Sequence, residues 1–266
     1  MQPWNIAHRG GAQLMPENTL AAFADALSRG CDGVELDVQL TRDGTVVVHH
    51  DFHLMADVAR RSGEWLAVPG PRIKDLTLEE LRQYDVGLPR RGSVYSDTHP
   101  LLKPVDKAPV PTLEDVTALA AQAGRRFVLF VEMKCDASPD SADPQSLADA
   151  AYDVIAQSGL LERIVFVGFD WRALARIRRR APTAVCWFTT DRLQGDARPV
   201  IDIIAQEGGQ GWFAHLADAT PEAIAHARAR GLKIGAWTVN TPADMRRLMG
   251  LDAICTDRPD LLDSLL

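Results

Sequence analysis

The sequence lacks the features that mark membrane proteins, disulfide-rich proteins and nucleic-acid-binding proteins. No apolar run approaches the ~20 residues of a membrane-spanning helix, so no integral membrane segment is expected. The four cysteines contain no CxxC pair, which predicts buried, reduced thiols at Cys31, Cys135, Cys186 and Cys255. Basic residues number 29 against 36 acidic ones, and the formal charge of -7 argues against a nucleic-acid partner, whose phosphates require Lys and Arg.

The chain also lacks the apolar core of a signal peptide, because a strand-like Trp4-Asn5-Ile6-Ala7 comes almost at once. We therefore expect a cytoplasmic protein, with a periplasmic parent that has lost its leader as the alternative. No feature of the sequence points to a particular oligomeric state.

Apolar strand-like runs alternate with amphipathic helical patterns along the chain. The helical patterns have clear starts, such as Thr220-Pro221 and Thr241-Pro242, where an N-cap precedes proline at the first helical position. This α/β alternation favours a closed (β/α)8 TIM barrel, with an open doubly wound sheet as the alternative, and we expect residues 1–266 to form one domain. The strand-like runs cover residues 5–8, 33–38, 127–133, 164–169, 184–188, 211–214, 233–239 and 253–255.

One long interval interrupts this alternation. Residues 52–111 separate a predicted hairpin from the next helical segment, which is far longer than an ordinary connection. The capping-box pattern Thr77-Leu78-Glu79-Glu80 predicts a short helix, and a Pro- and Gly-rich irregular stretch follows it. We interpret the interval as an insertion after the second barrel strand and its hairpin, either a lid that selects substrate or a structural addition.

Two carboxylates stand together in the second strand-like run. Glu35 and Asp37 are two residues apart, and side chains at that spacing point to the same face of a strand. The turn Thr41-Arg42-Asp43-Gly44 is too short for a helical crossover, so the next apolar run should return antiparallel. A hairpin centred there places His50 opposite Asp37 and sends His49 to the other face.

Glu132 adds a third carboxylate at the end of a later strand. It shares strand parity with Phe130 and Lys134, so its side chain should face the barrel interior. Polar residues at the carboxyl ends of barrel strands converge on one face. Glu35, Asp37 and Glu132 then offer three oxygen ligands, which suit one divalent cation, Mg²⁺ or Ca²⁺, better than zinc. A structural salt bridge is the alternative interpretation of the Glu-x-Asp pair.

Two histidines and two basic residues complete the candidate site. His8 and His50 can divide the roles of general acid and base, because imidazole changes charge near neutral pH. Arg9 and Lys134 can offset the charge of an anionic phosphate. Trp237 lies at a strand end, where it is either a core residue or an apolar wall for the substrate. The pattern indicates metal-assisted displacement at phosphorus. The other histidines are expected to be structural or exposed: His49, His53, His99, His215 and His226.

The order of several short motifs gives the chain a resemblance to a known family. The motifs are His8-Arg9-Gly10, Pro16-Glu17-Asn18-Thr19, Glu35-Leu36-Asp37-Val38, Thr41 with Asp43-Gly44, His50-Asp51, Pro111-Thr112-Leu113-Glu114, Glu132-Met133-Lys134, Trp237-Thr238-Val239-Asn240 and Thr256-Asp257-Arg258-Pro259. Together they make the chain similar to the glycerophosphodiester phosphodiesterase family, within the PLC-like phosphodiesterase superfamily.

The resemblance implies a distorted TIM barrel that hydrolyses small-molecule glycerophosphodiesters to sn-glycerol 3-phosphate and an alcohol. Either a neighbouring glycerol hydroxyl attacks phosphorus, giving a cyclic phosphate that water opens, or water attacks directly. The resemblance also implies roles for particular residues: a divalent cation on Glu35, Asp37 and Glu132, acid and base at His8 and His50, and phosphate contacts from Arg9 and Lys134.

Two departures from the family pattern bear on the substrate. Val167-Gly168-Phe169 stands where the family often has serine before the phenylalanine, and residues 52–57 lack its Arg-Thr-rich run. One alternative is a lysophospholipase D or sphingomyelinase-like enzyme that acts on lipid at an interface, for which Trp65 and Leu66 would offer apolar contact. A non-catalytic phosphodiester-binding protein is the other alternative, but such a protein has no need of an acid-base pair.

Overall fold

The computed structural model describes residues 2–124 and 126–266, and within these ranges eight parallel strands form a closed barrel. They pair in the order β1-β12-β11-β10-β9-β8-β7-β2, and β1 also pairs with β2, which closes the ring. Closure confirms the predicted (β/α)8 fold and rules out the open sheet. The barrel strands are β1 (Trp4–Ala7), β2 (Gly33–Leu40), β7 (Val128–Met133), β8 (Ile164–Gly168), β9 (Cys186–Thr189), β10 (Gly211–His215), β11 (Lys233–Trp237) and β12 (Ala253–Thr256).

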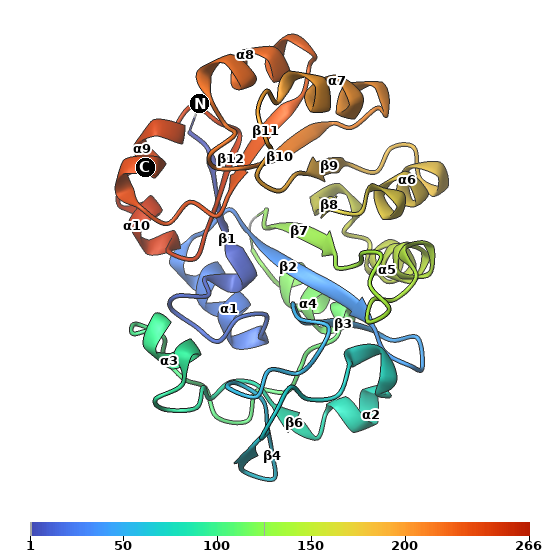
Figure 1. Cartoon of the computed structure of the whole chain (residues 1–266), viewed down its shortest axis with the longest axis vertical. Helices are drawn as coiled ribbons and strands as arrows, with labels where there is room; N and C mark the ends of the chain where they lie inside the picture. The colour runs from blue at the N-terminus through green and yellow to red at the C-terminus, as the bar shows by residue number, and fades with distance from the viewer. Residues whose placement is uncertain (1, 125) are drawn as a thin grey trace.

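Helices surround the barrel, with one in each connection that follows a barrel strand (Figure 1). Thr19, Thr220 and Thr241 cap helices because each hydroxyl accepts a hydrogen bond from the backbone N–H three residues ahead. None of the helices in the two described ranges combines the length and the apolar character that crossing a bilayer requires. These helices are α1 (Leu20–Arg29), α4 (Leu113–Ala121), α5 (Pro144–Ser158), α6 (Trp171–Arg180), α7 (Arg198–Gln206), α8 (Pro221–Ala229), α9 (Pro242–Leu248) and α10 (Pro259–Asp263); the one-turn η1 (His8–Gly10) follows β1, and η3 (Leu161–Arg163) precedes β8.

Aromatic side chains fill the inside of the barrel. The ring of Phe130 packs edge-on against Trp187, with 5.2 Å between centroids, and lies 5.6 Å from the ring of Phe213. Gly211 permits this packing, because a Cβ at that position would lie 2.5 Å from the indole of Trp187. Side chains alternate along β7, so Phe130 and Glu132 both face the inside of the barrel. Phe130 belongs to the packed interior, and Glu132 lies where that interior ends.

The hairpin after β2 differs from the prediction by one residue. The returning strand β3 (Val46–Val48) pairs with β2 through Val38↔Val48, and the backbone N–H of His49 donates to the carbonyl of Asp37 at 3.0 Å. The predicted placement of His50 opposite Asp37 is therefore wrong. Residues 41–45 form the turn, which places His49 opposite Asp37, whereas a position opposite Asp37 for His50 would need a turn one residue longer still.

Residues 52–111 stand outside the barrel at the lower edge of Figure 1, between β3 and α4. A separate core that includes Leu54, Ile73 and Leu81 holds this insertion together, and the predicted capping box at Thr77 begins its first α-helix. Its elements are β4 (Arg60–Arg61), β5 (Glu64–Trp65), η2 (Ile73–Asp75), α2 (Leu78–Leu81), β6 (Tyr84–Asp85) and α3 (Val94–Thr98), with the three strands paired in the order β5-β4-β6.

The two ends of the insertion meet at the barrel. The backbone N–H of Val48 donates to the carbonyl of Pro111 at 2.8 Å, and Val47 forms a β-bridge with Thr112. The insertion thus leaves the barrel and returns to it at nearly the same place.

Candidate active site at the carboxyl end of the barrel

A pocket of about 150 Å³ opens where the polar strand ends converge. All eight residues predicted for the site line it, together with two aromatic residues that the sequence analysis did not assign to the site. The lining residues are His8, Arg9, Glu35, Asp37, His50, Glu132, Lys134, Phe169, Phe213 and Trp237.

Three carboxylates form the floor of this pocket. Glu35 and Asp37 share one face of β2, and Asp37 lies beside Glu132 of the neighbouring strand β7 in the parallel register. One oxygen of each lies within 4.8 Å of the others, and all three residues are buried. Asn18 fixes the orientation of Asp37, because its Nδ2 donates to Asp37 Oδ2 at 2.8 Å.

The electrostatics of the three carboxylates are unequal. Burial and the charges of Asp37 and Glu132 raise the pKa of Glu35 well above its ordinary value, and burial likewise raises the pKa of Glu132. Burial acts in the same direction on Asp37, but attraction to His50 in its protonated form, and then to Arg9 and Lys134, outweighs burial and lowers the pKa of Asp37. The positive side chains nearby therefore do not fully offset the negative charge that Glu35 would carry when ionised.

Arg9 reaches the carboxylates from the loop after β1. Its Nε lies 3.4 Å from Asp37 Oδ2, and its Nη1 forms an ion pair with Glu17 at 3.1 Å. Its backbone N–H also donates to Glu35 Oε2 at 3.1 Å. The backbone of Arg9 is left-handed, with φ of 50°, a conformation that a residue with a Cβ seldom adopts and that aims both the amide and the guanidinium at the site.

Lys134 follows β7 and also approaches the carboxylates. Its Nζ lies 3.3 Å from Glu132 Oε1 and 3.8 Å from Asp37 Oδ1. Burial lowers the pKa of Lys134, but these two carboxylates outweigh burial and raise it, so the ammonium stays charged. Arg9 and Lys134 therefore bring two fixed positive charges to the pocket.

His8 is oriented by a carboxylate behind it. Its Nδ1 lies 2.6 Å from Asp257 Oδ1, and its Nε2 lies 3.8 Å from Glu35 Oε2 at the pocket. Asn240 Nδ2 donates to the second oxygen of Asp257 at 2.7 Å. Burial raises the pKa of Asp257, but the charge and hydrogen bond of His8 outweigh it and lower the pKa, so a negative charge stays behind the imidazole.

His50 has the same kind of support. Its Nδ1 lies 2.6 Å from Asp51 Oδ1, and its Nε2 lies 2.7 Å from Lys134 Nζ. An ammonium can only donate, so Nε2 accepts and Nδ1–H donates to Asp51. Gln39 shapes this bend, since its amide donates to the carbonyls of residues 49, 50 and 51. This bend, and not a ladder position opposite Asp37, brings His50 into the pocket.

Aromatic rings form one wall of the pocket. Phe169 packs edge-on against Trp237 with 5.2 Å between ring centroids, and the ring of His215 meets Trp237 at 5.5 Å. Trp237 therefore lines the pocket while it also packs against the aromatic cluster inside the barrel. Phe169 and Phe213 were missed because single aromatic residues in apolar runs look like core residues.

The residues that orient the site carried a weak signal in the sequence. Asn18, Asp51 and Asp257 each occur in a motif that contributed to the family resemblance, but their contacts with Asp37, His50 and His8 depend on loop geometry. His49 is buried, does not line the pocket and has a pKa that burial lowers, as expected of a structural residue.

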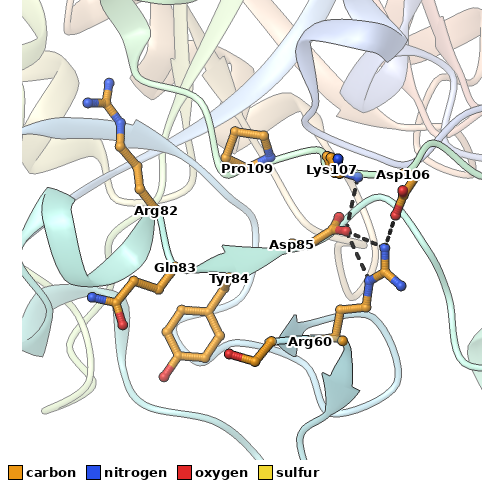
Figure 2. Close-up of a pocket in the computed structure, with 10 residues that line it drawn as sticks. Arg60, Arg82, Gln83, Tyr84, Asp85, Asp106, Lys107 and Pro109 are labelled. Carbon is orange, nitrogen blue, oxygen red and sulfur yellow. Dashed lines mark hydrogen bonds and ion pairs between the residues drawn. The ribbon is translucent and has the colours of Figure 1, made fainter.

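A larger pocket of about 480 Å³ lies in the insertion (Figure 2). Its polar groups hold the insertion together: Arg60 pairs with Asp85, with Nε to Oδ2 at 2.9 Å. Asp85 also accepts hydrogen bonds from three backbone N–H groups, those of Gly87, Lys107 and Ala108. Arg82 and Gln83 extend away from this ion pair in Figure 2, so the polar side chains do not converge on one point. The small pocket in the barrel is therefore the better candidate for chemistry.

Comparisons with known proteins agree with this geometry. The chain matches the model of the Glycerophosphoryl diester phosphodiesterase family over residues 8–261. A Caldanaerobacter subterraneus subsp. tengcongensis relative, named Glycerophosphodiester phosphodiesterase, is 30% identical over 98% of this chain and 96% of its own. A Silicibacter pomeroyi crystal structure, assigned as a glycerophosphoryl diester phosphodiesterase, has a TM-score of 0.89 at 32% identity, covering 98% of this chain and 92% of that one.

A further solved structure contains a bound product. It is an Oleispira antarctica phosphodiesterase in complex with the product sn-glycerol-3-phosphate, with a TM-score of 0.79 at 25% identity over 99% of this chain and 96% of that one. The family match over nearly the whole chain confirms the resemblance read from the motifs. The protein belongs to the glycerophosphoryl diester phosphodiesterase family and is a phosphoric diester hydrolase.

Proposed function

We propose that this enzyme hydrolyses small glycerophosphodiesters to sn-glycerol 3-phosphate and an alcohol, with one divalent cation bound at the three carboxylates. The observation that carries the proposal is the placement of two carboxylate-supported histidines, His8 and His50, at a pocket that also holds three acidic oxygens and two fixed cations. The product complex of the Oleispira antarctica relative supports the same product.

The donor set fits a divalent cation. Glu35, Asp37 and Glu132 offer buried carboxylate oxygens, which Mg²⁺ and Ca²⁺ prefer. Arg9 and Lys134 supply two positive charges against these three carboxylates, so the site without a cation has a deficit of positive charge. When bound, the cation would polarise a phosphoryl oxygen of the substrate.

Arg9 and Lys134 would bind the phosphoryl oxygens. Both cations lie at the pocket and approach different oxygens of Asp37, Arg9 Nε at 3.4 Å from Oδ2 and Lys134 Nζ at 3.8 Å from Oδ1. A phosphodiester that binds beside them would replace part of these contacts with contacts to its own anionic oxygens. Trp237 and Phe169 would form the apolar wall beside the glycerol carbons.

His8 and His50 would move the protons. One imidazole accepts the proton of the attacking oxygen as the new P–O bond forms, and the other donates a proton to the leaving alcohol oxygen as the old P–O bond breaks. The attacking group is either a neighbouring glycerol hydroxyl, which gives a cyclic phosphate that water opens, or water itself. Asp257 and Asp51 hold the two rings so that each turns one nitrogen toward the pocket.

The size of the pocket favours a small substrate. Its volume of about 150 Å³ is below the ~300–1,000 Å³ of pockets for drug-sized ligands. A lysophospholipase D or sphingomyelinase-like activity would need apolar contacts at a membrane, but Trp65 donates its Nε1–H to the carbonyl of Leu88, and Leu66 packs against the insertion's own core. The two carboxylate-supported histidines favour an enzyme over a non-catalytic binding protein, which has no need of an acid-base pair. We take residues 1–266 to act as one domain. The cytoplasmic location stays a prediction.

Release of sn-glycerol 3-phosphate from glycerophosphocholine and glycerophosphoethanolamine tests the proposal. We expect release with Mg²⁺ or Ca²⁺, loss of release in excess EDTA, and its return when metal is restored. His50→Ala should abolish turnover, whereas His226→Ala, a matched change at a histidine paired with Asp202 on the outer helices, should not. No release under any condition, or a His50→Ala variant that keeps most of its rate, would contradict the proposal.

A further inference from the structure

The insertion contacts the loop that carries Arg9, although no residue of the insertion lines the pocket. The loop between β1 and α1 is held from outside at three places. The contacts are Gln13 Nε2 to Thr98 O at 3.2 Å, Lys103 N to Leu14 O at 2.9 Å, and Tyr95 Oη to Glu17 Oε2 at 3.2 Å.

This loop has a backbone that needs such support. Arg9 and Asn18 are two of the four non-glycine residues with positive φ in the described part of the chain, at 50° and 55°. Residues with a Cβ occupy this region only where surrounding contacts hold them there. Both side chains reach the carboxylate cluster, Arg9 through Nε and Asn18 through Nδ2. The contacts from the insertion therefore bear on residues of the site.

Tyr95 makes the contact that leads directly to the site. Its hydroxyl donates to Oε2 of Glu17, and the other oxygen of that carboxylate, Oε1, accepts from Arg9 Nη1 at 3.1 Å. Arg9 Nε in turn lies 3.4 Å from Asp37 Oδ2. Because Tyr95 and Arg9 hold different oxygens, the hydroxyl fixes the rotation of the carboxylate that holds the guanidinium.

Tyr95 is itself fixed in place. Its ring stacks on His99 with 4.1 Å between centroids and 13° between planes, and Ser93 caps the short helix α3 that carries it. Burial and the charge of Glu17 raise the pKa of Tyr95 well above its ordinary value, so the hydroxyl keeps its proton and remains a donor.

We propose that Tyr95 is a positioning residue for phosphodiester hydrolysis, through which the insertion sets the orientation of Arg9 by way of Glu17. The inference rests on the proposed function, because it takes Arg9 to bind the phosphoryl group of the substrate. Tyr95 touches neither substrate nor reacting atoms, and its effect is confined to how well the guanidinium is held for phosphate.

Tyr95→Phe in the full chain tests this inference, because it removes the hydroxyl and keeps the ring. We expect the KM for glycerophosphocholine and the inhibition constant for inorganic phosphate both to rise, by about three- to tenfold, since the charge-assisted hydrogen bond that is lost acts on the phosphate only through Glu17 and Arg9. The fall in kcat should be smaller. Tyr84→Phe is the matched control, a buried tyrosine in the same insertion outside this chain of contacts, and should leave both constants unchanged.

A second variant tests the same contacts at Glu17, the residue between Tyr95 and Arg9. Glu17→Gln should raise the inhibition constant for phosphate at least as much as Tyr95→Phe, and the double variant should add little, because both changes act through Arg9. If Tyr95→Phe does not yield folded protein, an unchanged phosphate constant in Glu17→Gln overturns the inference.

The outcomes separate the inference from the proposed function. A parent enzyme without phosphodiesterase activity contradicts the proposed function, whatever the variants do. A parent that is active, with a Tyr95→Phe variant whose KM and phosphate constant match those of the parent, overturns the positioning role alone. A lower melting temperature with unchanged constants overturns it equally, because it reduces Tyr95 to a structural contact of the insertion.

Discussion

Asp257→Asn tests whether the carboxylate behind His8 is needed for catalysis. In the parent, Asp257 Oδ1 lies 2.6 Å from His8 Nδ1, and Oδ2 accepts from Asn240 Nδ2 at 2.7 Å. The amide of the variant is nearly the same size, so the loop should keep its shape. If its oxygen stays on Asn240, its NH₂ group faces Nδ1, which must then become an acceptor. The proton of neutral His8 moves to Nε2, and the ring loses the negative charge that stabilises its protonated form.

The expected loss follows from that one contact. A hydrogen bond to a charged group contributes about 1.5–3 kcal/mol, which corresponds to a factor of roughly 10 to 150 in rate if the contact acts in the transition state. We expect kcat/KM to fall by about a hundredfold, mostly through kcat, because the contacts that we propose between the substrate phosphate and Arg9 and Lys134 are untouched.

The assay is release of sn-glycerol 3-phosphate by parent and variant at the same metal concentration. Asp252→Asn is the matched control, since Asp252 pairs with Lys233 at 2.7 Å at the opposite end of the barrel and should lose no activity. Melting temperatures of all three proteins show that each is folded. A folded Asp257→Asn variant with more than half of the parent's kcat/KM would refute the reasoning.

Three further predictions concern the metal, the core and the insertion. Glu35→Gln should weaken Mg²⁺ binding in calorimetry, and unchanged affinity would contradict its assignment as a ligand. Gly211→Ala forces a Cβ to within 2.5 Å of the indole of Trp187, and should cost about 1–3 kcal/mol and several degrees of melting temperature; Gly250→Ala, where a Cβ meets open space, should cost far less. Burial raises the pKa of Asp85, but hydrogen bonds from backbone N–H groups and Arg60 outweigh it and lower the pKa. Its carboxylate therefore adds stability above about pH 4, and this contribution disappears as pH falls through the lowered pKa. Asp85→Asn should have a lower free energy of unfolding at pH 7, and that free energy should depend less on pH in the acid range. Urea titrations that show the same acid dependence for variant and parent would count against this.

The parts of the site that strand geometry dictates could be predicted from the sequence. Glu35 and Asp37 share a face because side chains alternate along β2, and Glu132 faces inward for the same reason on β7. Closure of the barrel then brings them together with His8 and Arg9, which follow β1. Each of these placements needs only the period of a strand and the direction of a parallel sheet.

Loop-dependent features could not be predicted in this way. The position of His50 depends on the length of the turn at residues 41–45 and on the bend that Gln39 holds, and neither follows from apolar periodicity. The contact of Tyr95 with Glu17 joins residues 78 positions apart through an insertion whose path the sequence does not specify. Phe169 looked like a core residue because it ends the apolar run at residues 164–169. It is instead 39% exposed, since it lies just beyond the end of β8.

The meeting of the insertion's two ends at Val48 and Pro111 makes residues 52–111 an exchangeable module. A segment of another length could leave and re-enter the barrel at the same hydrogen bond, at a loop-closure cost that rises only slowly with length. The barrel and the proposed acid-base pair could thus stay constant while related enzymes vary the segment beside the pocket. Any replacement segment would have to bring its own hydrogen-bond donor to Glu17.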